Sequence, residues 1–416
     1  MSNTNLKKNF IWNTIGSFTA AISSLFYTLV LTRFSDLNTT GLYTIAFAIA
    51  CTMVTLASFG GRTYQVTDAK NEISSFSYII SRYFTVGITI ILLIIYLFIK
   101  DYDVSKFFVI LAICLFKFLE EVSDVYYGVL QKNDYLYKVG IFQFTKSLVN
   151  ILLFTLLTIL WNNLFISFLI LFLINILFLI FVERKSASLC NKWKFGFSKA
   201  EIIKYFKANV LICILTFLTT YIVNCPKYAI DSILTNDLQA IFGIIVMPAT
   251  VMLLVGNFIL NPFIVSIAEK YNENNIKELS KLLFKVFGIM FLIGVAVFVV
   301  CFFIGIPLLN LIYGINLDKY KTSLLIIIVG SVFYAVTAGI STTLVAMRII
   351  KSQVIGNLIV ILFAFIGCNY LVENYGVLGA SMTYTLLILI RFIIYVVIMI
   401  FSLMKRKKSI TGESLV

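Results

Sequence analysis

The chain has 416 residues, of which 61% are apolar and only 12% are charged, and its net charge is +14. Soluble domains carry about 25% charged residues, so a soluble fold of this size could not cover its surface with polar groups. The composition therefore excludes a soluble multidomain enzyme and a disordered chain, and it indicates a polytopic membrane protein.

Apolar runs long enough to cross a hydrocarbon core of about 30 Å follow one another along the chain, separated by short loops. The twelve runs lie at 10–31, 41–60, 79–99, 105–130, 139–160, 164–182, 206–225, 238–262, 284–305, 322–346, 353–372 and 378–403. We therefore expect an all-α membrane protein with about 12 transmembrane helices. The first run is longer than the apolar core of a signal peptide, so we expect it to be retained as a helix.

The longest polar segment separates the sixth run from the seventh and is rich in lysine. We predict a six-helix N-terminal lobe at 1–182, a basic cytoplasmic linker at 183–205, a six-helix C-terminal lobe at 206–404 and a cytoplasmic tail at 405–416. Two equal halves joined by a linker are typical of duplicated transporters.

The lysines and arginines set the orientation of the chain in the membrane. With the N-terminus inside, the cytoplasmic segments hold roughly four of these residues for each one on the outer side. We therefore place both termini in the cytoplasm. The positive charge then faces anionic lipid, and no nucleic-acid partner is expected.

The chain lacks the residues that several kinds of catalytic and metal site require. The chain has no histidine, which excludes histidine-based triads, haem ligation and zinc–histidine sites. Its seven cysteines lie far apart and form no C-x-x-C pair, so we expect buried small hydrophobic residues. No glycine precedes a lysine, so the G-x-x-x-x-G-K-[ST] phosphate loop is missing. We expect no metal and no cofactor.

Ionisable side chains interrupt the fourth apolar run, at a depth where they should face a partner or a cavity. They are Lys117, Glu120, Glu121 and Asp124. At helical spacing, Lys117, Glu121 and Asp124 form one stripe, and Glu120 lies at its edge. Lys117 is also placed to pair with Glu121 four residues later.

The fifth run carries Lys146 on the same helical face as Gln143 and Asn150. Lys146 and Asp124 both lie about 12 Å from the turn that joins the two runs, at 1.5 Å per residue. We therefore predict a contact between Asp124 and Lys146. Two interpretations stay open: a buried ion pair that holds the two helices together, or groups that line a cavity.

Further candidates lie elsewhere in the chain. Arg391 is near the middle of the last run, too deep to reach the interface, and should face protein or water. Arg33 and Lys227 lie at outer helix ends, where interface anchoring is the alternative to a binding role. Arg62 is expected at the cytoplasmic mouth, where topology alone would also explain it. Pro248 lies inside the eighth run and is a candidate hinge or a static kink.

Four stretches carry a resemblance to a known family. They are Lys7–Asn13 with Thr32-Arg33-Phe34 and Gly41-Leu42-Tyr43; Phe59–Asp68; Glu121–Lys132; and Asn224–Asp231 with Ile241-Phe242-Gly243 and Met247-Pro248-Ala249. In their order and spacing, the chain resembles bacterial Wzx-like polysaccharide repeat-unit flippases. These belong to the multidrug/oligosaccharidyl-lipid/polysaccharide exporter (MOP) superfamily.

The resemblance implies a two-lobed, V-shaped fold with a central cavity that works by alternating access in the bacterial inner membrane. It implies an undecaprenyl-diphosphate-linked oligosaccharide as substrate, with a polymerase and glycosyltransferases of the same pathway as possible partners. The implied diphosphate contacts are Arg33, Lys117, Lys227 and Arg391, and Arg62 would receive the headgroup at the cytoplasmic mouth. The implied coupling or ion-pair residues are Glu120, Glu121, Asp124 and Lys146.

Other functions compete with this interpretation. An ion-coupled multidrug exporter of the same superfamily would share the fold and bind amphipathic cations at the acidic residues. A membrane-embedded polysaccharide polymerase or acyltransferase typically needs a sizeable outer loop or a catalytic histidine, and the chain offers short outer loops and no histidine. A scaffolding membrane protein would explain neither the deep ionisable residues nor the two-half layout.

Overall fold

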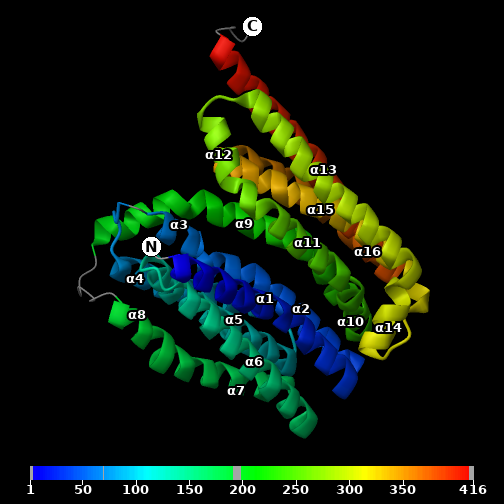
Figure 1. Cartoon of the computed structure of the whole chain (residues 1–416). Helices are drawn as coiled ribbons and strands as arrows, with labels where there is room; N and C mark the ends of the chain where they lie inside the picture. Colours follow the sequence, from blue (N-terminus) through cyan, green and yellow to red (C-terminus); the bar gives the residue numbers. More distant parts are fainter. Residues whose placement is uncertain (1–2, 69, 191–197, 412–416) are drawn as a thin grey trace. The chain divides into compact units, whose positions relative to one another are not determined.

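The computed structural model describes residues 3–68, 70–190 and 198–411 (Figure 1). The first part of the chain folds into α1 (Asn3–Phe34), α2 (Leu37–Ser58), α3 (Gly61–Thr67), α4 (Ser75–Ile99), α5 (Val104–Lys132), α6 (Leu136–Trp161), α7 (Leu164–Phe178), a π-helical turn η1 (Leu179–Arg184), α8 (Lys185–Cys190) and α9 (Lys199–Ile233).

The remainder is equally helical. It forms α10 (Asn236–Ile245), α11 (Met247–Leu260), η2 (Asn261–Phe263), α12 (Ile264–Asn272), α13 (Ile276–Val300), η3 (Cys301–Gly305), α14 (Ile306–Tyr313), η4 (Asp318–Tyr320), α15 (Lys321–Ala346) and α16 (Lys351–Thr411). The described residues contain no β-strand. The expected all-α fold is confirmed.

Ten helical segments of the described chain are long and apolar enough to cross a membrane. They include α16 as one helix, although Gly376 breaks it with a φ of 56°. They do not include α5, which carries the four ionisable residues of the fourth run. Every expected apolar run nevertheless lies in a helical segment. The fourth run lies in α5, the last two lie in the two arms of α16, and the others lie in the remaining segments. The protein is a multi-pass membrane protein.

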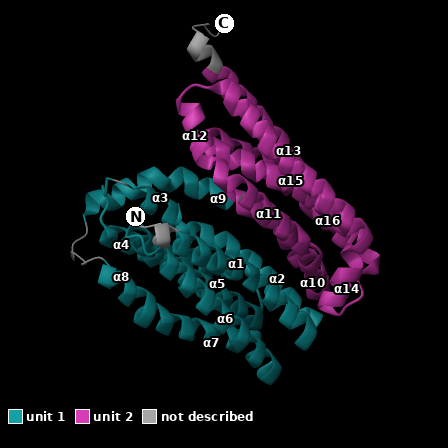
Figure 2. Ribbon diagram, viewed as in Figure 1, with its two compact units in different colours: residues 1–217 teal, residues 218–416 magenta. Residues whose placement is uncertain are grey.

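The chain divides into two compact units, residues 1–217 and 218–416 (Figure 2). The division falls inside α9, which begins in unit 1 and ends in unit 2. The lobe boundaries at 182 and 206 remain a prediction, and residues 191–197 of the predicted linker lie outside the described residues. The last five residues of the predicted tail, 412–416, lie outside them as well.

In unit 1, α5 is the central helix. It packs against α2, α3, α4, α6, α7, α8 and η1, so its ionisable side chains face protein rather than lipid. In unit 2, α15 has the corresponding role and packs against α11, α12, α13 and α16. A helix surrounded in this way can carry polar groups that the lipid-facing helices cannot.

The eighth run is interrupted where the sequence indicates. A single turn residue, Val246, separates α10 from α11, and Pro248 lies in the first turn of α11. Proline is tolerated there because the backbone N–H that it lacks has no helical partner in a first turn. That Pro248 acts as a hinge remains a prediction.

The most extensive helix–helix contact of unit 1 joins α1 and α6. Two glycines permit it. A Cβ atom on Gly16 would lie 2.2 Å from the carbonyl oxygen of Gly140, and one on Gly140 would lie 2.1 Å from that of Trp12. Small residues allow the same close approach between membrane helices generally.

We expect Gly140→Ala to destabilise the protein by about 1–3 kcal/mol, because the added methyl group meets backbone that cannot move aside. The measurement is thermal unfolding of the purified protein in detergent. Gly87→Ala in α4 is the matched control, since a Cβ atom there meets nothing within 4 Å. Equal melting temperatures for the two variants would contradict the close contact.

Candidate functional site

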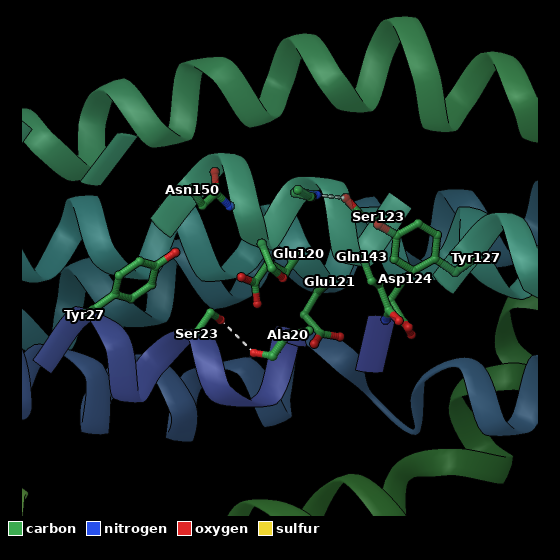
Figure 3. Close-up of a pocket in the computed structure, with 12 residues that line it drawn as sticks. Ala20, Ser23, Tyr27, Glu120, Glu121, Ser123, Asp124, Tyr127, Gln143 and Asn150 are labelled. Atoms are coloured by element: carbon green, nitrogen blue, oxygen red, sulfur yellow. Dashed lines mark hydrogen bonds between the residues drawn. The ribbon is translucent and has the colours of Figure 1, made fainter. Parts of the chain in front are cut away.

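A polar cavity of about 190 Å³ lies inside unit 1, between α1, α5 and α6 (Figure 3). Small residues of α1 leave the space, and polar side chains of α5 and α6 point into it. The lining residues are Ala20, Ser23 and Tyr27 from α1; Glu120, Glu121, Ser123, Asp124 and Tyr127 from α5; and Gln143, Lys146, Ser147 and Asn150 from α6. The stripe predicted on the fourth run therefore faces a cavity.

A second cavity of about 180 Å³ adjoins the first and shares Ala20, Ser23, Tyr27 and Glu120 with it. Half of its other lining residues are aromatic; the residues are Tyr43, Phe47, Phe116, Phe168, Lys117, Ala21, Ser24 and Ile113. The rings pack edge-on and stacked; the ring centroids of Tyr43 and Phe168, for example, lie 5.9 Å apart. Glu120 is the carboxylate common to both cavities.

Lys117 pairs with Glu120, three residues further along α5, and its Nζ lies 5.7 Å from the ring centroid of Phe47. The sequence-based pairing of Lys117 with Glu121 is therefore wrong. Spacings of three and four residues both bring side chains together on a helix, and the choice depends on the neighbouring helices. Here α4 supplies the partner of Glu121.

That partner is Arg82, whose side chain is only 3% exposed. Its Nη1 donates to Oε2 of Glu121 at 3.1 Å and to the carbonyl of Ala57 at 3.1 Å, and its Nη2 lies 3.9 Å from Oδ2 of Asp124. Nε of Arg62, in α3, lies 3.6 Å from the other oxygen of Asp124. Two arginines thus neutralise two carboxylates at one end of the cavity.

Lys146 has a different partner from the predicted one. Its Nζ donates to Oγ of Ser123 at 2.8 Å and lies 3.2 Å from Oε1 of Glu183, whereas Asp124 points toward Arg62 and Arg82. The predicted Asp124–Lys146 contact is wrong, because equal depth on neighbouring helices does not fix the direction of a side chain. Glu183 belongs to the π-helical turn η1 and is fully buried.

Two charged residues of this site were not recognised from the sequence. Arg82 lies near the start of the third apolar run, and Glu183 is the first residue of the predicted linker. Both lie within or directly after an apolar run, Arg82 four residues into its run and Glu183 one residue after the end of its own. A charged residue within or next to an apolar run lies near membrane depth, so these positions indicate that Arg82 and Glu183 can face protein.

Arg391 occupies a separate polar site within unit 2. It is 1% exposed. Its guanidinium donates to Oδ1 of Asn357 at 3.0 Å, to Oγ1 of Thr219 at 3.0 Å and to the hydroxyl of Tyr395 at 3.3 Å. Among the described residues no carboxylate lies within ion-pair distance, and Nη1 has no hydrogen-bond partner. Arg391 faces protein, as expected, and its role toward a diphosphate stays a prediction.

The remaining candidates are Arg33 and Lys227. Arg33 is exposed in the last turn of α1, and Lys227 is half-buried in α9 beside Pro226. Neither is among the lining residues of the two cavities. The structure thus brings Arg62, Lys117, Glu120, Glu121, Asp124 and Lys146 into one region of unit 1, and their roles stay predictions.

Comparison with known proteins places the fold. The chain matches no protein-family model. It is 24% identical over 382 residues to the capsular polysaccharide biosynthesis protein CapF of Staphylococcus aureus, covering 91% of this chain and 95% of that protein. Among solved structures it resembles an inward-facing MATE multidrug transporter of the MOP superfamily, with a TM-score of 0.66, 13% identity and coverage of 93% and 96% of the two chains.

It also resembles the lipid II flippase MurJ, with a TM-score of 0.65, 14% identity and coverage of 95% of this chain and 90% of that one. The chain has the fold of the MOP superfamily. The fold that the sequence motifs imply is thereby confirmed. The charged cavity of unit 1 thus lies in a fold that this chain shares with a multidrug transporter and a lipid II flippase.

We expect Arg82→Met to destabilise the protein by about 3–5 kcal/mol, because it leaves Glu121 buried without its cation. Adding Glu121→Gln should recover part of the loss. Thermal unfolding in detergent measures both. The exposed pair Lys281–Glu278 supplies the control, since Lys281→Met should cost at most about 1 kcal/mol. If Arg82→Met were as mild as Lys281→Met, the ion pair would not support the fold.

Asp68, just outside the membrane-spanning helices, closes the loop between α3 and α4. Burial opposes its ionisation, yet the backbone N–H groups of Glu72 and Ile73, the ammonium of Lys132 and the hydroxyl of Tyr78 hold its pKa below the usual value. A carboxyl with a lowered folded pKa stabilises the fold above its unfolded pKa, and this contribution is lost as the pH falls through the folded value.

We therefore expect Asp68→Asn to lower the melting temperature at neutral pH and to have progressively less effect as the pH falls into the acid range. Melting curves over a pH series measure this. Asp101→Asn changes an exposed carboxylate in the turn between α4 and α5 and should leave the curves unchanged. A constant difference between wild type and Asp68→Asn at every pH would show that ionisation of Asp68 contributes nothing.

Proposed function

We propose that the protein moves a polyprenyl-diphosphate-linked oligosaccharide from the inner to the outer leaflet of a bacterial cytoplasmic membrane, by alternating access. The observation that carries the proposal is the pair of adjoining cavities in unit 1, lined by ionisable and hydroxyl groups within otherwise apolar helices. The similarity to a capsular polysaccharide biosynthesis protein and to the fold of a lipid II flippase supports the choice of substrate.

The chemistry of such a substrate fits the lining. A diphosphate and its sugars cannot enter hydrocarbon unaided, whereas a polyprenyl tail can stay in lipid throughout. Each cavity is smaller than the roughly 300–1,000 Å³ that encloses a drug-sized ligand. It therefore suits one part of a headgroup, a phosphate or a single sugar, rather than the whole oligosaccharide.

The two cavities suit different parts of the headgroup. Lys146 lines the first and offers an ammonium to a phosphate oxygen. The hydroxyls of Tyr27 and Tyr43 and the carboxylate of Glu120 line the second and can hydrogen-bond to sugar hydroxyls. In this arrangement both termini are cytoplasmic. Glycosyltransferases of the same pathway would supply the substrate, and a polymerase would consume it.

A second candidate function rests on the aromatic cavity. Rings of Tyr43, Phe47 and Phe168 beside the carboxylate of Glu120 also suit an organic cation, because ring faces attract positive charge. The protein would then be an ion-coupled exporter of amphipathic cations. Accumulation of a fluorescent organic cation in cells with and without the gene separates the two functions, and only an exporter lowers it.

Deletion of the gene tests the flippase proposal. We expect lipid-linked oligosaccharide to accumulate on the inner leaflet, where periplasmic enzymes cannot reach it, and wild-type protein to restore its transfer. Accumulation on the outer leaflet would exclude a flippase. In complemented cells, Lys146→Met should slow transfer by about 10-fold, as expected for loss of one hydrogen bond to a charged group. Lys281→Met removes an exposed lysine and should transfer normally.

A further inference from the structure

Glu183 is a carboxylate in an unusual position. It is fully buried and lies in η1, the π-helical turn that follows α7. Turns of this kind are uncommon and often occur at functional sites, because the extra residue redirects the following side chains. Glu183 is not itself a lining residue of the cavity, but its two partners, Lys146 and Tyr127, line it.

Only one oxygen of the carboxylate is used. Oε1 accepts a hydrogen bond of 2.6 Å from the hydroxyl of Tyr127 and lies 3.2 Å from Nζ of Lys146. Oε2 is buried and has no hydrogen-bond partner among the described residues. An unpaired oxygen of an ionised carboxylate is costly in a buried site. A proton on Oε2 neutralises the group and so removes the cost of a buried negative charge, while Oε1 can still accept hydrogen bonds.

We propose that Oε2 of Glu183 is a proton-binding site, and that its protonation releases Lys146 to bind an anionic group in the cavity. The proton comes from a hydronium ion of the solvent, which becomes water, and it stays on Oε2; Lys146 remains charged throughout. When Glu183 is ionised, it competes with any anion for the ammonium. When Glu183 is neutral, Lys146 has lost its counter-charge and attracts a phosphate-like anion to the lining that it already reaches.

The surroundings of Glu183 favour this assignment. Lys146 from α6 and Tyr127 from α5 are the titratable groups in direct contact with it. Tyr126, Asp124 and Glu120 lie further away on α5, and Asp124 already has two arginine partners. The α7 helix carries no charged residue, and Arg184 and Lys185 beside Glu183 are exposed. Lys146 is therefore the cation whose pairing depends most on the state of Glu183.

Proton binding at Glu183 and anion binding at Lys146 are thermodynamically linked. If a proton on Glu183 strengthens anion binding by some factor, the anion must strengthen proton binding by the same factor. We expect a factor of about 10, within the usual range of couplings between sites. An anion that does not itself titrate, such as sulfate, would then strengthen proton binding by Glu183 about 10-fold.

Infrared difference spectroscopy of the full-length protein in lipid vesicles tests the proton site. On acidification, we expect a carbonyl band from a carboxylic acid in an apolar environment, distinct from the bands of exposed acids. Glu183→Gln should remove this band, and Glu278→Gln, which changes an exposed glutamate, should leave it. Absence of the band at every pH at which the protein stays folded, or its persistence in Glu183→Gln, would overturn the proposal.

Sulfate is the probe for the second half of the proposal. In wild type, sulfate should move the titration of this band to higher pH. Lys146→Met should abolish the shift and Lys146→Arg should keep it, a difference that a merely structural lysine would not produce. An equal shift in Lys146→Met would show that sulfate acts elsewhere, and no shift in wild type would show that Glu183 and the anion are uncoupled. Either result overturns the role of Lys146.

One further control separates a failure to fold from this result. If Glu183→Gln fails to fold, the double variant Lys146→Met with Glu183→Gln removes both charges, and the band must be absent in it. The proposal rests on the proposed function only in taking a diphosphate as the natural anion. The infrared experiment uses no lipid-linked substrate, so it can fail while leaflet transfer in cells is normal, or succeed while transfer is unaffected by the protein.

Discussion

Pairing of buried charges is the constraint on which unit 1 depends. Its central helix, α5, carries Glu120, Glu121 and Asp124 at a depth where a lone charge is expensive. Each carboxylate has a cation from its own helix or a neighbour, and Lys146 is matched by Glu183. The charged cavity can exist in an apolar bundle because these pairs cancel one another locally.

The same pairing limits what the cavity can bind. No cation that lines it is without a carboxylate partner, so an anion must compete with a group of the protein itself. Such competition weakens simple binding but gives the protein a means of control, since any event that neutralises the carboxylate strengthens the anion site. Buried ion pairs that add little to stability can still have this role.

The sequence predicts the helices because their hydrophobic pattern is regular. It does not predict the ion-pair partners of Lys117 and Lys146, because these depend on the direction of each side chain. Apolar runs identify every spanning helix, and the stripe on α5 is recognisable because helical spacing is regular. The contacts of Lys117 and Lys146 depend on which neighbour supplies Arg82 and Glu183. A π-helical turn at the end of α7 redirects Glu183, and nothing in a single apolar run indicates such a turn.

Arg391 has a consequence for the energetics of the whole protein. The ion pairs of unit 1 carry no net charge, whereas this buried guanidinium is held by the neutral oxygens of Thr219, Asn357 and Tyr395. A membrane voltage of 100 mV is worth about 2.3 kcal/mol for one elementary charge that crosses it. Any displacement of Arg391 along the membrane normal is therefore electrogenic, and the resting potential of a cell biases its direction.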